Sequence, residues 1–377
     1  MSRCRVDTSI ERVVVGGFEF PLGAYPIEPI EPSEGYTTHF ESADGGEDDA
    51  VLGDGWEEWP DRYVWDVVIR AGRVEAFWRS LAAHLPGRFF PILDVLGNDA
   101  YRENDPYVAD ELVSLERFME GLRRFKSFLF EDGLVGFGAM SDEPFFYIFV
   151  DEHKVVTIRA EASLKEKVEA VLDAFDLRPV EKLASVDSVM HEHRSVLDAP
   201  EDRPDLLTPD EVIEELRDLW TLTLNVDDEA NNDENGSPLG ITPFRCLVRL
   251  LGPAADVKYI DVFLTADCLR TAWTLAMDAA EDLYQRESEK AARAAGKPRG
   301  GEDPKTRPGQ TGGRVGGRLG RAGLGDDPAD SPDEPIDIDV IHADRVKIED
   351  FAGMVPDGRG KNLPMDSSRV IATQWLE

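Results

Sequence analysis

Three short apolar segments that follow one another closely constrain the fold of this chain more than any other part of the sequence. They span 134–140, 145–150 and 155–160, and only four residues separate each segment from the next. Connections of that length suit antiparallel hairpins and are too short for the crossover that parallel neighbours need. The segments therefore predict three adjacent antiparallel strands. Because the middle one (FFYIFV) is apolar on both faces, we expect it at the centre of a sheet, covered on both sides.

Extended and helical patterns alternate around these strands. Apolar residues spaced three and four apart predict helices at 74–85 and 106–130, and Ser163 with Glu166 forms the capping-box pattern that opens a further helix. Residues 62–180 therefore form a first expected domain, with the element order β-α-β-α-β-β-β-α. The first two strands of that order are expected at 63–69 and 88–95.

A second domain is expected at 208–290, after a connector at 181–207. Thr208 and Glu211 form a fuller capping box, with proline at the first helical position, and predict a helix that ends at residue 219. Three extended segments and a long helix follow, and Thr265 is expected to cap that helix. The extended segments are 220–226, 244–251 and 258–264.

Composition changes sharply after the second domain. Residues 296–335 hold 11 Gly and 6 Pro in 40 positions, with few large apolar side chains to offset the chain entropy lost on folding. We therefore expect a disordered linker at 291–335. Residues 336–377 are expected to be a C-terminal β segment that docks on the second domain, and residues 1–61 an acidic, largely irregular extension. The C-terminal strands are expected at 336–340, 345–348 and 369–375.

The elements together predict an α+β fold: two mixed or antiparallel sheet domains with packed helices, a disordered Gly/Pro/Arg-rich linker and a C-terminal strand segment. The hydrophobic content of 42% is enough for a core. No stretch approaches the roughly 18 consecutive apolar residues of a membrane helix, and the first fifteen residues lack the apolar region of a secretory signal. Cys4, Cys246 and Cys268 form no CxxC pair, which favours a reducing compartment, expected to be the cytoplasm, and argues against zinc.

The charge of the chain limits its partners. It carries 41 Lys and Arg against 76 Asp and Glu, a net charge of −35. Such a charge opposes binding to a phosphate backbone or an anionic membrane and favours a basic protein partner, although solubility alone also explains it. Gly-Gly-Arg recurs at 312–314 and 316–318, so RNA contact through 296–325 is a lower alternative, weakened by the lack of aromatic side chains there.

Acidic residues gather at both ends of the three predicted strands. Asp142 and Glu143 lie at one end, roughly 20 Å from the other, so the two groups cannot share a site. The larger group could bind a divalent cation or supply an acid–base pair, which makes a metal-dependent enzyme the alternative function, although polar turns between apolar strands are common. That group comprises Glu131, Asp132, Asp151, Glu152 and His153.

A histidine pair lies in the connector. His191 and His193 flank Glu192, but the zinc motif HExxH would need a histidine where Ser195 stands. Residues at this spacing share one face of a strand and lie on opposite sides of a helix. No cysteine lies nearby to complete a ligand set, so surface histidines are the preferred interpretation.

A calcium-loop pattern is also incomplete. Asn231, Asp233, Asn235 and Gly236 match the first positions of such a loop. Thr242 stands where a bidentate glutamate belongs, and the flanking segments are predicted strands. An acidic, solvated hairpin loop therefore explains this segment better than a calcium site.

Catalytic signatures are missing from the sequence. It contains no GxSxG elbow, no phosphate loop, no HExxH and no strand–GxGxxG–helix unit, and no cofactor is expected. The first expectation is therefore a non-enzymatic binding or regulatory protein that engages a basic protein partner. Its oligomeric state is left open.

Overall fold

The computed structural model describes residues 4–43, 60–200, 202–203, 205–233, 235–251, 257–294, 336–360 and 363–376. The chain divides into two compact units. The first unit contains residues 1–98 and 102–227, and the second contains 99–101 and 228–377. Most of the expected linker, from residue 295 to 335, lies outside the described residues, as do residues 44–59 of the expected N-terminal extension.

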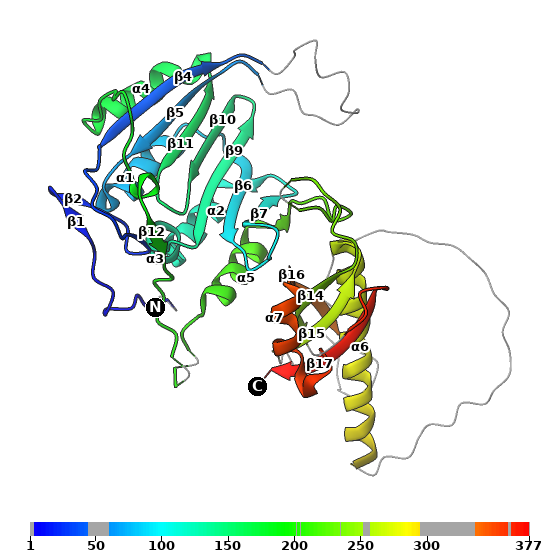
Figure 1. Ribbon diagram of the computed structural model, residues 1–377. Coiled ribbons are helices and arrows are strands. Elements are labelled where there is room, and N and C mark those ends of the chain that lie inside the picture. The colour runs from blue at the N-terminus through cyan, green and yellow to red at the C-terminus, as the bar shows by residue number, and fades with distance from the viewer. Residues whose placement is uncertain are drawn as a thin grey trace, which may run out of the picture. The chain divides into compact units, whose positions relative to one another are not determined.

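Within the described residues, nine strands form an antiparallel sheet in the first unit (Figure 1). Their order is β13-β7-β6-β9-β10-β11-β5-β4, and β8 pairs with β6. The three predicted strands are β9, β10 and β11 at the middle of the sheet, and their antiparallel pairing is confirmed. The strands are β4 (Gly35–Glu41), β5 (Arg62–Val68), β6 (Arg88–Leu96), β7 (Asn104–Ala109), β8 (Val113–Ser114), β9 (Val135–Asp142), β10 (Phe145–Val150), β11 (Val156–Glu161) and β13 (Leu222–Leu224).

Helices cover one face of this sheet, and α1 and α2 are seen behind the strands in Figure 1. Phe146, Ile148 and Val150 of β10 point to that face and are fully buried. Tyr147 and Phe149 point to the opposite face and are only half-buried, so the expected cover on both sides is incomplete. The helices are α1 (Ala71–Ala82), α2 (Leu115–Arg124), α3 (Lys126–Glu131), α4 (Lys165–Ala174) and α5 (Pro209–Trp220).

An aromatic stack attaches α5 to the first unit. The ring of Phe118 lies between Trp78 and Trp220, with centroid distances of 5.4 and 4.4 Å. Gly121 makes the contact possible, because a Cβ there would lie 2.6 Å from the indole nitrogen of Trp220. The sequence predicts that the helix ending at 219 and the strand at 220–226 belong to the second domain. In the structure they complete the first core and sheet, since this apolar face of α5 packs on α2 and β13 pairs with β7.

Several local predictions made from the sequence are wrong. Residues 106–109 belong to β7 and not to a helix, because Tyr107 and Ala109 alternate into the core while the strand pairs with β6. The expected helix at 106–130 is therefore reduced to α2 and α3. Ser163 lies in a 3-10 turn and caps nothing, whereas the capping box of Thr208 and Glu211 is confirmed.

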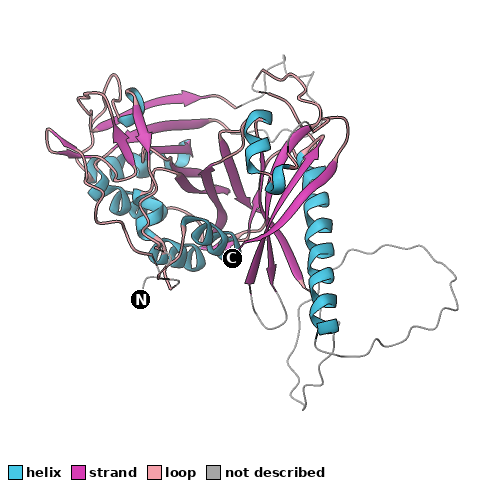
Figure 2. Cartoon of the chain, turned by 60° about the horizontal axis from the view of Figure 1, so that its bottom comes forward, coloured by secondary structure: helices cyan, strands magenta, loops and turns pink. Residues whose placement is uncertain are grey.

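The second unit is a four-stranded antiparallel sheet, counted over the described residues, with the order β16-β14-β15-β17. Helix α6 (Leu269–Ala294) lies along one face (Figure 2), and the apolar side of α7 (Ile348–Met354) packs on the other. Helix α7 begins where a strand at 345–348 was expected. Thr265 lies in β15, where its hydroxyl donates to the carbonyl of Ser367, and does not cap α6. The strands are β14 (Thr242–Leu251), β15 (Val257–Ala266), β16 (Asp337–Arg345) and β17 (Arg369–Leu376).

The predicted α+β class is confirmed, with antiparallel sheets in both units and strands contributed by the C-terminal segment. Cys246 lies on β14 in the sheet of the second unit and is buried, and this burial raises the pKa of its thiol. Among the described helices, none combines the length and the hydropathy that crossing a membrane requires.

Candidate metal centre

A two-stranded sheet in the first unit, separate from its nine-stranded sheet, carries the histidine pair. Strand β12 (His191–His193) pairs with β3 (Ala24–Pro26), so two segments far apart in the sequence lie side by side. Because side chains alternate along a strand, His191 and His193 project from the same face of β12, and Glu192 projects from the other and is exposed. The N-terminal segment, expected to be largely irregular, therefore contributes the strand that orients this pair.

Two glycines bring this small sheet against the end of the main sheet. A Cβ on Gly133 would lie 2.0 Å from the carbonyl oxygen of Gly23, and a Cβ on Gly23 would lie 2.0 Å from the Gly133 nitrogen. The close approach allows backbone hydrogen bonds from Gly133 N to Arg194 O (3.0 Å) and from Arg194 N to Gly23 O (2.7 Å). Side chains at either glycine would prevent it, so these positions fix β12 beside the start of β9.

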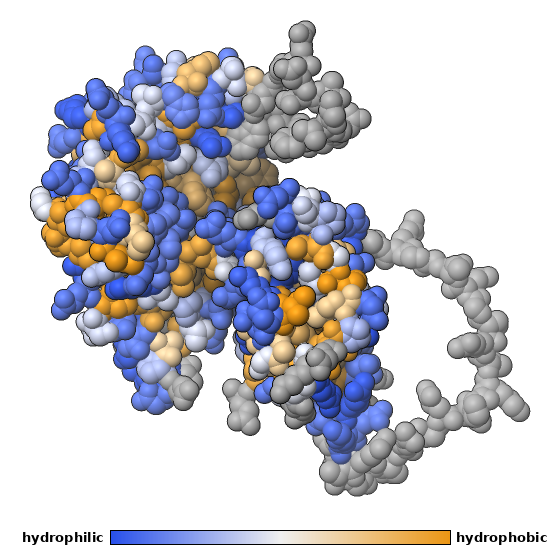
Figure 3. All heavy atoms as spheres, in the orientation of Figure 1, coloured by the Kyte–Doolittle hydropathy of each residue, from blue (hydrophilic) through white to orange (hydrophobic). Residues whose placement is uncertain are grey.

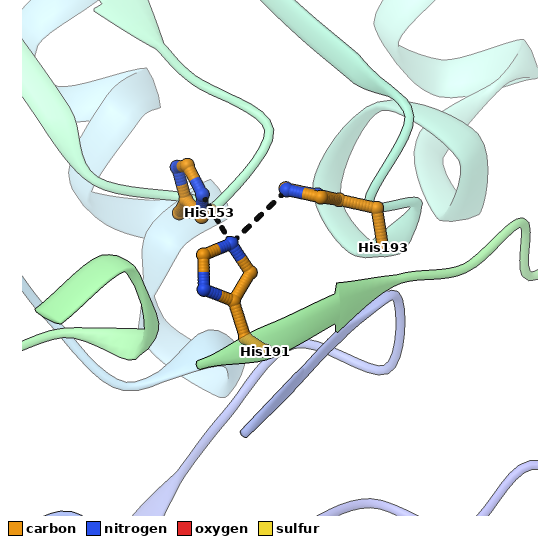
Figure 4. Close-up of side chains that lie close together, drawn as sticks. All are labelled: His153, His191 and His193. Atoms are coloured by element: carbon orange, nitrogen blue, oxygen red, sulfur yellow. Dashed lines mark hydrogen bonds between the residues drawn. The ribbon is translucent and has the colours of Figure 1, made fainter. Parts of the chain in front are cut away.

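Three imidazoles meet at this place (Figure 4). The Nε2 atom of His191 lies 3.0 Å from Nε2 of His153 and 3.1 Å from Nε2 of His193. His153 comes from the turn between β10 and β11, and the centroids of the three rings are 4.8–4.9 Å apart. The structure places His191 and His193, which the sequence suggested are surface histidines, beside His153, and all three side chains are half-buried.

The opposite ring nitrogens determine which atoms carry protons. Nδ1 of His191 lies 2.8 Å from the carbonyl oxygen of Val189, and Nδ1 of His193 lies 2.7 Å from that of Gly133. Because a carbonyl only accepts, each Nδ1 donates, and the neutral ring keeps a lone pair on Nε2. Nδ1 of His153 faces carboxylates in the same way, 3.5 Å from Asp151 and 3.4 Å from Glu152. With all three rings neutral, their Nε2 lone pairs face one another, and a shared proton or a metal ion between the nitrogens removes this repulsion.

This arrangement fits a metal ion. Zinc binds imidazole nitrogen at about 2.0–2.1 Å in tetrahedral geometry, which places ligand nitrogens about 3.3 Å apart. The 3.0 and 3.1 Å separations lie between this value and the roughly 2.9 Å of ligands at right angles, so they fit imidazoles that share one ion. Metal-bound histidines also donate their second N–H to a carbonyl or a carboxylate. His191 and His193 donate to carbonyls here, and Nδ1 of His153 faces two carboxylates at ion-pair distance.

Comparisons with models of known families, with curated proteins and with solved structures find no match. The chemistry of the centre is therefore inferred from the side chains themselves.

Burial and neighbouring carboxylates adjust the basicity of the rings. Burial lowers the pKa of His153, but Asp151 and Glu152 raise it by more, so its pKa lies above the ordinary value. Burial lowers the pKa of His193, and the other two rings add to this effect. The ammonium group of Lys154 is buried, which lowers its pKa to about 8, and it donates to the carbonyl of Val135 at 2.6 Å. Lys154 therefore anchors the turn that presents His153.

Glu131 and Asp132, the other acids of the expected group, hold neighbouring segments of the chain together by hydrogen bonds. Glu131 accepts two hydrogen bonds from Arg12 and one from the backbone of Leu22, which holds the N-terminal segment in place. Asp132 accepts from Ser195 and from the backbone of Val196, directly after β12. The structure thus brings Asp151, Glu152 and His153 together but gives Glu131 and Asp132 different partners.

The remaining candidate residues lie away from this centre. Asp142 and Glu143 are at the opposite end of β9 and β10, as expected. In the calcium-like loop, Asp233 accepts from the backbones of Asn235 and Ser237, and the side-chain amide of Asn231 donates to Gly240. These contacts and a bridge between Asn232 and Pro238 close the loop on itself. The flanking strands β13 and β14 belong to different sheets, so the expected hairpin between them is not formed, and residue 234 lies outside the described residues.

In the sequence, the three histidines fall into two separate groups. His153 lies among acids, and His191 with His193 forms an isolated pair. The signal that joins them is the i, i+2 spacing on a strand together with a third histidine in a turn at the sheet end, but pairing of β12 with β3 could not be read from the sequence.

Proposed function

We propose that the first unit binds a divalent transition-metal ion through Nε2 of His153, His191 and His193. The observation that carries this proposal is the convergence of three Nε2 atoms in rings whose Nδ1 atoms all face acceptors. A proton on one Nε2 relieves only part of the repulsion, whereas one ion engages all three nitrogens. Of the alternatives raised by the sequence, the metal-dependent one gains support, with histidines in place of acids as ligands.

Zinc is the ion that this ligand set fits best. Imidazole nitrogen suits Zn²⁺, Cu²⁺, Ni²⁺ and Fe²⁺, while Mg²⁺ and Ca²⁺ prefer oxygen. A set of three histidines is one that zinc uses in catalytic sites, with water or substrate at the fourth position. We therefore expect selective binding of zinc, with cobalt as a spectroscopic substitute.

Calorimetry on the full chain tests the proposal. Metal-free protein should bind one equivalent of Zn²⁺, and His191→Ala should weaken binding by at least about 100-fold, since even losing an outer partner costs 10- to 100-fold. His39→Ala is the matched control, because His39 lies on β4 and contacts Glu41. Equal affinities of wild type and His191→Ala, or binding of Mg²⁺ and no Zn²⁺, would contradict the proposal.

The charge of the chain supports a second candidate function, docking to a basic protein. Hydrophilic side chains occupy much of the visible surface in Figure 3, and the net charge is −35. Such a partner should co-purify at low salt and dissociate as salt rises. Within the described part of the chain, Cys4, Cys246 and Cys268 form no disulfide, which is compatible with the cytoplasm as the expected compartment.

A further inference from the structure

The number of protein ligands at the proposed centre indicates whether the ion is structural or reactive. Among the described residues, the group that meets at the three Nε2 atoms contains histidines alone. Asp151 and Glu152 form a separate group with His153, on its Nδ1 side, and so orient the ring without reaching the ion. The described chain therefore supplies three nitrogen ligands.

Three protein ligands are typical of reactive zinc sites. Structural sites are closed by four protein ligands, whereas catalytic sites keep the fourth position for water or substrate. We infer, building on the proposed metal binding, that the ion keeps an exchangeable fourth position and hydrolyses uncharged carbonyl compounds such as esters. Asp151 and Glu152 are then positioning residues for His153.

The surroundings favour an uncharged substrate. Asp151, Glu152 and Asp187 all act electrostatically on His153, and Glu152 acts on Asp94 of β6. Lys154 is 2% exposed and its ammonium group is bonded to a backbone carbonyl, so it does not offer a positive charge to solvent. An anionic substrate such as a phosphate ester would meet carboxylates on its approach and be repelled.

An apolar surface lies next to these acids. Asp94 pairs in register with Gly136 on the sheet face that the helices leave uncovered. Tyr147 and Phe149 project from the same face and are half-buried. Because Gly136 has no side chain, the ring of Phe149 lies across it, within 2.8 Å of where a Cβ would stand. This surface suits the apolar part of an ester.

The reaction balances with water as the only co-reactant. Zinc lowers the pKa of bound water to about 7, so hydroxide forms near neutral pH. The hydroxide oxygen would bond to the carbonyl carbon, and the bond from that carbon to the alcohol oxygen would break. The leaving alcohol oxygen would take up a proton equal to the one that the bound water released. The products are a carboxylic acid and an alcohol, and a new water binds the ion.

Cobalt substitution tests the exchangeable position. Imidazole added to the Co²⁺-loaded full chain should shift the visible absorption bands in a saturable way while cobalt stays bound. An unchanged spectrum with cobalt still bound would overturn this inference and leave the proposed metal binding intact. Failure of the chain to bind Co²⁺ or Zn²⁺ would instead overturn the proposed function.

Two chromogenic substrates test the reaction and its charge preference. The Zn²⁺-loaded protein should hydrolyse p-nitrophenyl acetate at least about tenfold faster than His193→Ala, with His39→Ala unchanged and little hydrolysis of p-nitrophenyl phosphate. Equal ester rates in wild type and His193→Ala would overturn the hydrolytic role. Faster hydrolysis of the phosphate than of the acetate would overturn the substrate class.

Discussion

Replacing Gly133 with alanine should weaken metal binding without removing any ligand. The new Cβ would stand 2.0 Å from the carbonyl oxygen of Gly23 and 2.5 Å from its carbonyl carbon. Ordinary contact begins near 3.4 Å, so the two backbones must separate by about 1.4 Å. Metal–ligand distances tolerate only about 0.2 Å, and the Gly133 carbonyl also holds Nδ1 of His193. We therefore expect a loss of Zn²⁺ affinity of about 100-fold.

The matched control is Gly87→Ala, because a Cβ at Gly87 meets nothing within 4 Å. Calorimetric titration with Zn²⁺ gives both affinities, and circular dichroism verifies that each variant is folded. A folded Gly133→Ala protein that binds Zn²⁺ as tightly as wild type would refute the idea that this contact positions His193.

Three further predictions concern pH and stability. Zn²⁺ affinity should fall as pH drops from about 7 to about 5, because the ion needs neutral imidazoles and His153 has a raised pKa; titrations across pH measure the slope, and a flat profile would argue against histidine ligands. Asp99→Ala should lower the free energy of unfolding in urea by about 3 kcal/mol, because it leaves Arg345 buried without its ion partner, whereas Asp339→Ala at a more exposed pair should cost under about 1 kcal/mol. Burial raises the pKa of Asp94 to about 6, so the free energy of unfolding of the wild type should fall as pH rises from about 4 through 6 and this carboxyl ionises. Asp94→Asn should therefore be more stable than wild type by about 1 kcal/mol at pH 7.5 and lose this advantage at pH 4. A difference in the same urea assay that did not depend on pH would contradict this prediction.

The parts of the fold that local patterns determine were predictable from the sequence. The hairpins that join β9, β10 and β11 follow from short turns between apolar segments, and the start of α5 follows from Thr208 and Glu211. Where pairing partners lie far apart, local patterns fail. Pro106–Ala109 resembles the first turn of a helix, but pairing with β6 makes it a strand.

The candidate centre was missed for the same physical reason. His153 and His191 are 38 residues apart, and no local pattern joins them. Their meeting depends on pairing of β12 with β3 and on the close contact of Gly23 with Gly133, and both are tertiary interactions between segments distant in the sequence. The sequence indicates the acids near His153 as possible metal ligands. In the structure, Asp151 and Glu152 orient its ring, and Glu131 and Asp132 accept hydrogen bonds from the neighbouring backbone.

X-ray absorption at the zinc edge of the loaded full chain tests the central claim most directly. The account predicts one bound Zn²⁺ per chain with imidazole scattering from three histidines at about 2.0 Å and one further light atom, and loss of one imidazole shell in His193→Ala. A shell made of oxygen ligands alone, or an unchanged spectrum in His193→Ala, would contradict it.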